Sequence, residues 1–142
     1  MIDAHINGVK IIMQISQKRK NEQQDNLLEE LLREKAAVLS RAGMAVDDVL
    51  TQLKHVDKEI EVKISLLKTF SDNEHASEVL QKKQSIHEEI NLSIDHFNAI
   101  RQKAQLQYYY LIVTREALGL RRHEMIQEIY RIPERKEKIK AF

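Results

Sequence analysis

Glycine and proline, the residues that most often end a helix or turn the backbone, are nearly absent from this chain. The 142 residues include three glycines and one proline, at positions 8, 43, 119 and 133. Between these positions little in the sequence would interrupt a regular element, and the length suits one domain. Long helical segments are therefore the first expectation.

The expected breaks divide the chain into four helices. Gly43 fits a left-handed residue that ends one helix, and Asp47 fits the cap of the next. Ser71 or Asp72 fits the same capping role, and positions 119 and 133 end the last two segments. We predict helices over about 4–41, 47–70, 72–118 and 122–131, followed by a solvated, frayed tail over 133–142.

Apolar residues recur at spacings of three and four along the second and third segments. They are Val49, Leu53, Val56, Ile60, Leu67 and Phe70 in the second, and Val79, Ile86, Ile90, Phe97, Ala104 and Leu111 in the third. Lys63 and Lys83 interrupt this stripe, where a charge either selects register or partner or faces solvent. The pattern is typical of a coiled coil. We predict an all-α fold, an elongated antiparallel helical hairpin or three-helix coiled coil with a short C-terminal helix, as a single domain over 1–142.

Residues 6–15 fit two periodicities. Val9, Ile11, Met13 and Ile15 alternate as in a strand, whereas Ile2, Ile6, Val9 and Met13 follow helical spacing. We expect a helix, because the sequence offers no second strand and an isolated strand leaves its backbone groups unpaired. A strand exchanged within a dimer is the alternative.

Unequal helix lengths predict self-association. The second segment is shorter than its neighbours, so the two longer helices should extend past it at opposite ends. The extensions, residues 2–15 and 97–113, are both apolar. Apolar surfaces of this size are rarely exposed on a monomer, so we expect a homo-oligomer, most simply a dimer.

The sequence contains no motif for catalysis or metal binding. Without cysteine there is no thiolate nucleophile, zinc-thiolate site or disulfide, and three scattered glycines form no phosphate loop. The six histidines include no Glu-x-x-His or His-Glu-x-x-His pair. We interpret His55 and His87 as solvated residues on polar faces. No enzyme activity, cofactor or metal is expected.

The most unusual stretch is residues 108–113, which holds three of the four tyrosines. Six consecutive bulky residues cover every side of a helix, so protein should surround this part on several sides. One interpretation is a local core with the returning helix; the other is a partner-docking surface, for which tyrosine is well suited. The candidate partner-binding residues are Tyr108, Tyr109, Tyr110, Leu111, Arg121, Arg122 and Tyr130.

Charge and hydropathy complete the functional expectation. No secretory signal or apolar run long enough to span a membrane is visible, so we expect a cytoplasmic protein. We predict a non-enzymatic scaffold or adaptor that binds an unidentified protein through its coiled-coil faces and the region 108–132. The alternative is a dimeric nucleic-acid-binding protein, because residues 101–142 carry ten basic and five acidic side chains and include a weak helix-turn-helix outline.

Overall fold

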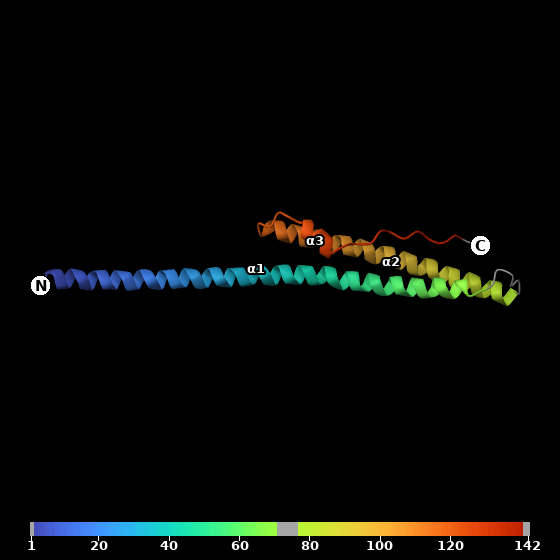
Figure 1. The fold of residues 1–142 in the computed structure, drawn as a ribbon, viewed down its shortest axis with the longest axis horizontal. Helices are drawn as coiled ribbons and strands as arrows, with labels where there is room; N and C mark the ends of the chain where they lie inside the picture. The colour runs from blue at the N-terminus through green and yellow to red at the C-terminus, as the bar shows by residue number, and fades with distance from the viewer. Residues whose placement is uncertain (1, 71–76, 141–142) are drawn as a thin grey trace. The chain divides into compact units, whose positions relative to one another are not determined.

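The residues that the structure describes form three helices (Figure 1). The computed structural model describes residues 2–70 and 77–140, with side chains from residue 6 onward. The helices are α1 (Ile2–Lys68), α2 (Ser77–Ala117) and α3 (Glu124–Ile129), and the described residues contain no strand. The predicted all-α helical hairpin with a short C-terminal helix is therefore confirmed.

Internal contacts divide the chain into an N-terminal unit, Met1–Val38, and a C-terminal unit, Leu39–Phe142. In the N-terminal unit α1 passes through residues 6–15, so the helical interpretation of that segment is confirmed. Nearly all its large apolar side chains are exposed, among them Ile6, Ile12, Met13, Leu27 and Leu31. A single domain over residues 1–142 stays a prediction.

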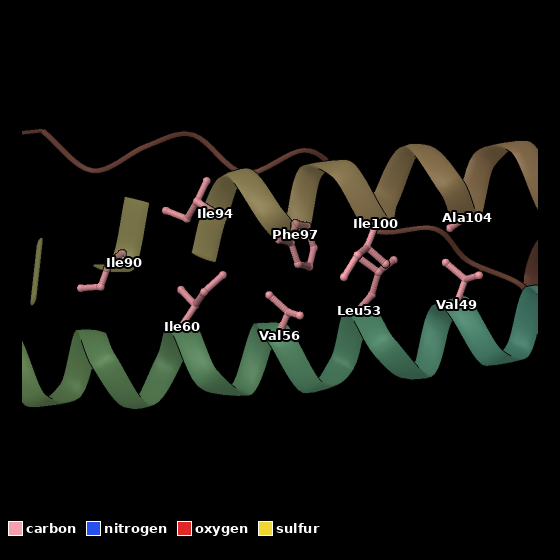
Figure 2. Packing of buried hydrophobic residues seen from close by; sticks show 9 residues of the cluster. All are labelled: Val49, Leu53, Val56, Ile60, Ile90, Ile94, Phe97, Ile100 and Ala104. Carbon is pink, nitrogen blue, oxygen red and sulfur yellow. The ribbon is translucent and has the colours of Figure 1, made fainter. Parts of the chain in front are cut away.

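The C-terminal unit is held together by an apolar seam between α1 and α2 (Figure 2). The buried cluster consists of Val49, Leu53, Val56 and Ile60 from α1, and Ile90, Ile94, Phe97, Ile100 and Ala104 from α2. The α1 members and the predicted α2 positions 90, 97 and 104 match the stripe expected from spacing. Burying each Leu, Ile or Phe side chain contributes about 1.5–3 kcal/mol, so this seam dominates the stability of the hairpin.

The predicted helix break at Gly43 is wrong. α1 runs without interruption from Ile2 to Lys68, so the first two predicted helices are one, and the three-helix coiled-coil alternative is not what forms. A glycine inside a helix costs about 0.8–1.0 kcal/mol relative to alanine. Packing of Val46 and Val49 immediately beyond it outweighs that cost. Asp47 accordingly lies within α1 rather than at its start.

The prediction of an apolar overhang at residues 97–113 is also wrong. Phe97 and Ala104 belong to the cluster packed between α1 and α2, and Leu111 is buried as well, so this stretch is not an unpaired extension. Its other sides, with Leu106, Tyr109, Tyr110 and Val113, are exposed. Both lysines of the predicted stripe are withdrawn from solvent to different degrees. Lys63 is half-buried and donates a hydrogen bond to Ser93 Oγ across the helices at 3.0 Å, whereas Lys83 is 8% exposed.

Gly119 ends α2 as predicted. Its φ is +88°, and it is the one residue with a left-handed backbone in the part of the chain described here. Leu120 N donates to Arg115 O at 2.9 Å and Gly119 N donates to Glu116 O at 3.0 Å, the two bonds of a Schellman cap.

The last helix is shorter than the predicted 122–131. α3 spans Glu124–Ile129, and the residue at its N-cap makes no side-chain hydrogen bond. The predicted cap at Ser71 or Asp72, and residues 72–76 of the third predicted helix, lie outside the described residues.

The cap at Gly119 gives a test of this local geometry. We expect Gly119→Ala to lower the free energy of unfolding by about 1–2 kcal/mol, because a Cβ strains the left-handed conformation. Urea unfolding monitored by circular dichroism measures it. Gly8→Ala is the matched control, because Gly8 is helical with no atom within 4 Å of an added Cβ. An equal loss in both variants would contradict the assignment.

Candidate functional site

The tyrosine cluster of α2 divides into a buried side and an exposed side. Leu111 is 3% exposed and belongs to the core, whereas Tyr109 and Tyr110 are 61% and 51% exposed. The rings of Tyr109 and Tyr110 lie 6.1 Å apart at 53° and form one aromatic patch. Tyr108 is half-buried, and its buried hydroxyl has no hydrogen-bond partner among the described residues. Leu111 therefore fits the core interpretation of this stretch. Tyr109 and Tyr110 are exposed, which is compatible with the docking interpretation.

Tyr130 follows α3 and packs against α1 in the C-terminal unit. A Cβ placed on Gly43 would lie 2.8 Å from Tyr130 Oη, so glycine leaves the space that the phenol uses. Partial burial and, secondarily, the Asp47 carboxylate raise the pKa of Tyr130 above its usual 10.0. The folded protein therefore holds this proton more tightly than the unfolded chain, and this contribution to stability falls as the pH rises above about 10.

A polar cluster fixes the turn between α2 and α3. Arg115 Nε donates to His123 Nδ1 at 3.3 Å, and His123 Nε2 donates to Glu116 Oε1 at 3.2 Å. Arg115 Nη2 also donates to the carbonyl oxygen of Arg122 at 2.9 Å. The side chains of Arg121 and Arg122 are exposed. The predicted partner-binding residues are thus not one continuous site, because Leu111 is in the core and Tyr130 is an internal contact.

The prediction of a frayed tail is wrong for residues 133–140. This segment has no helix, but it follows α2 in the reverse direction and makes specific contacts with it (Figure 1). Near its start, Arg101 Nε donates to Pro133 O at 2.7 Å, and near its end His87 Nε2 donates to Lys140 O at 2.7 Å. We call residues 132–140 the docked tail.

Two asparagines on α2 bind the backbone of the docked tail at two points each. Asn98 Nδ2 donates to Lys136 O at 2.9 Å, and Asn98 Oδ1 accepts from Lys136 N at 2.9 Å. Asn91 does the same with Ile139, at 3.2 Å to the carbonyl oxygen and 2.9 Å from the amide nitrogen. Each amide side chain thereby replaces the pairing that a neighbouring strand would supply.

Side chains of the docked tail complete the contact. Ile132 and Ile139 pack against the seam cluster. Lys136 Nζ lies 2.6 Å from Asp57 Oδ1 of α1 and 4.8 Å from the centre of the Phe97 ring. Lys138 Nζ lies 3.2 Å from Asp95 Oδ2 of α2. Beside the tail lies a pocket of about 750 Å³, lined by residues of α1, α3 and the tail and by Phe97 of α2.

The contacts that hold the tail are individually weak. Each hydrogen bond contributes about 0.5–1.5 kcal/mol, and each partly exposed ion pair about 0.2–1 kcal/mol. Ordering the backbone of one residue costs about 1–2 kcal/mol. The half-buried Ile132 and Ile139 add apolar contacts with the seam cluster. The tail is thus held by many contacts that are each weak.

The interpretation of His87 as a solvated residue is wrong, since it is buried and hydrogen-bonded to the tail. His55 is exposed, as expected. The asparagine pair was missed, although a signal for it existed: Asn91 and Asn98 each directly follow a seam residue, Ile90 or Phe97, and repeat at the heptad spacing of the seam. A polar residue that repeats at heptad spacing beside the seam indicates that one segment of chain runs along that side of the helix.

The fold and these contacts define a helical hairpin that carries an extended segment of its own chain along α2. Comparison with protein-family models, with curated proteins and with solved structures finds no match to this chain. Across the described residues, no group of three or more histidine, aspartate or glutamate side chains is placed to hold a metal ion. In the same part of the chain, none of the helices is long and apolar enough to cross a membrane.

Substitutions can separate the core side of the tyrosine cluster from its exposed side. Leu111→Ala should lower the free energy of unfolding by about 2–5 kcal/mol, because it leaves a cavity in a buried position. Tyr109→Ala should change it by about 0.5 kcal/mol or less, since that ring is exposed. Urea unfolding of both variants decides the point, and a comparable loss for Tyr109→Ala would place this tyrosine in the core.

The contact of Tyr130 with Gly43 can be measured with a double-mutant cycle. In a Tyr130→Phe background, Gly43→Ala should stabilise α1 by about 0.8–1.0 kcal/mol through helix propensity. In the wild-type background the added Cβ meets Tyr130 Oη, so the gain should be clearly smaller or reversed. Equal effects of Gly43→Ala in both backgrounds would show that the hydroxyl does not occupy this position.

Proposed function

We propose that this protein is a non-enzymatic helical scaffold or adaptor of the cytoplasm, which self-associates as a dimer and binds another protein. The observation that carries the proposal is the exposure of large aliphatic side chains along the N-terminal unit. They include Ile6, Val9, Ile11, Ile12, Met13, Ile15, Leu27, Leu28, Leu31, Leu32 and Val38. We call these residues the N-terminal apolar face.

The spacing within this face supports a helical partner. Ile6, Val9 and Met13 repeat at intervals of three and four, and Leu27, Leu28, Leu31 and Leu32 show the same intervals. Because such a stripe is buried most readily against a second helix, a coiled-coil contact is the mode of association proposed. α1 has 67 residues and α2 has 41, so α2 is 26 residues too short to pair with all of α1. A second copy of α1 would supply the missing helix.

The tyrosine patch of α2 is the second contact surface proposed. Tyr109 and Tyr110 offer rigid aromatic area with a polar end, a combination enriched in protein interfaces. Exposed Arg121 and Arg122 lie in the following turn and would add charge at its edge. Leu111 is buried and Tyr130 contacts Gly43 of α1, so neither side chain belongs to the exposed patch.

Nucleic-acid binding by the basic C-terminal third is the less favoured alternative. Several of its cations are engaged within the chain: Lys136 with Asp57, Lys138 with Asp95, and Arg101 with a tail carbonyl. Phosphate binding would compete with these contacts. A mobility shift that falls steeply between low and physiological salt would favour this alternative.

Self-association can be tested through the N-terminal apolar face. We expect the wild-type chain to have a mass above the 16.7 kDa of one chain by sedimentation at micromolar concentration. Leu27→Ser with Leu31→Ser should reduce it to the monomer mass, because two aliphatic contacts become polar. Helicity by circular dichroism should be retained.

Leu92→Ser is the matched control, since Leu92 is similarly exposed on α2 but outside the N-terminal apolar face. It should leave the mass of the assembly unchanged. A wild-type chain that sediments as a monomer, or an equal effect of the control, would overturn the proposed self-association.

A further inference from the structure

We propose that the surface along Asn91 and Asn98 that the docked tail occupies, called the groove from here on, is a binding site for an extended basic segment of a partner protein, with the docked tail as its built-in competitor. This site is separate from the N-terminal apolar face and does not depend on self-association. The docked tail shows what the groove accepts, because every contact it makes defines a requirement on a ligand.

The first requirement is an exposed backbone. Asn98 and Asn91 each offer one donor and one acceptor to a single residue, at distances of 2.9–3.2 Å. This pairing recognises the peptide N–H together with the carbonyl oxygen, and every residue except proline has both groups. The groove can therefore bind segments that differ in sequence, as long as they are extended and free to pair.

The second requirement is register. Asn91 and Asn98 are seven positions apart, which on a helix rising about 1.5 Å per residue corresponds to about 10.5 Å. Their partners Ile139 and Lys136 are three positions apart, and at about 3.1–3.4 Å per residue extended chain covers about 9–10 Å. The two repeats agree, so a ligand held by one asparagine presents its backbone to the other.

The third requirement is charge and an aliphatic anchor. Asp57 of α1 forms an ion pair with Lys136 at 2.6 Å, and Asp95 of α2 forms one with Lys138 at 3.2 Å. The face of Phe97 adds a contact for the first ammonium group. Ile139 packs against the seam cluster beside them. The ligand class is thus an extended segment with lysine, any residue, lysine and then an aliphatic residue.

The tail can be displaced because its anchoring is local. It makes no regular secondary structure, and it is held by separate contacts: side-chain hydrogen bonds to its backbone, partly exposed ion pairs, and the half-buried Ile132 and Ile139. Its connection to the hairpin gives it a high effective concentration, which a partner segment must overcome. In this arrangement the tail sets the threshold for partner binding and shields the groove when no partner is present.

Fluorescence anisotropy with a labelled peptide of residues 131–140 tests the proposal in full-length protein. Lys136→Pro with Ile139→Pro removes both tail N–H donors and should release the tail while the groove stays intact. We expect this variant to bind the peptide at least about ten-fold more tightly than the wild-type chain. Adding Asn91→Ala and Asn98→Ala should abolish that gain.

Backbone recognition has a matched control in the peptide itself. N-methylation at positions 136 and 139 should lower affinity by about ten-fold or more, because both donors are lost. N-methylation at positions 137 and 138 alters the same number of amides where no hydrogen bond to the groove is made, and should have little effect. Equal binding of the two methylated peptides, or of the peptide to wild-type and tail-released chains, would overturn the proposal.

Hydrogen exchange provides a readout if the proline variant loses helicity. An excess of isotopically heavy peptide should accelerate amide exchange at positions 136 and 139 of the wild-type tail, and unchanged exchange would overturn the proposal. A wild-type dimer that becomes monomeric on tail release would identify a second copy's tail as the occupant and would likewise overturn it. Leu27→Ser with Leu31→Ser should leave peptide binding unchanged, which separates this outcome from failure of the proposed self-association.

Discussion

Burial of the seam between α1 and α2 is the interaction on which the other features of the C-terminal unit depend. The seam fixes the axial register of the two helices, and that register places Asp57 of α1 opposite Asn98 and Phe97 of α2. Lys136 can contact all three because the helices cannot slide without exposing aliphatic surface. The surface that the tail occupies is thus a consequence of the same seam packing that stabilises the hairpin.

Spacing predicts the seam well because it depends on many residues at once. Val49, Leu53, Val56 and Ile60 repeat at intervals that only a helix places on one side, so an error at one position would not alter the conclusion. The Gly119 cap was equally predictable, since a left-handed residue at a helix end strongly favours glycine. Both predictions concern local backbone geometry, which nearby sequence determines.

Single residues were predicted poorly where a distant contact decides their role. Gly43 resembles a helix end, but its contact is Tyr130, far along the sequence, and helix propensity alone is too weak to break α1 there. In the sequence His87 resembles a solvated residue, but in the folded chain the tail covers it. The mixed-charge tail has the composition of a frayed end because its backbone, more than its side chains, makes the contacts. Backbone recognition leaves almost no trace in the sequence of the segment recognised.

The two surfaces proposed for binding differ in what they can discriminate. The N-terminal apolar face would select a partner by matching aliphatic side chains along a helix, so its specificity depends on sequence over several turns. The asparagine pair selects conformation first, because amide groups pair with backbone that a helical partner has already used internally. An extended segment and a helix therefore do not compete for the same surface. If both proposals hold, the two surfaces would bind different classes of partner, which is the property that an adaptor requires.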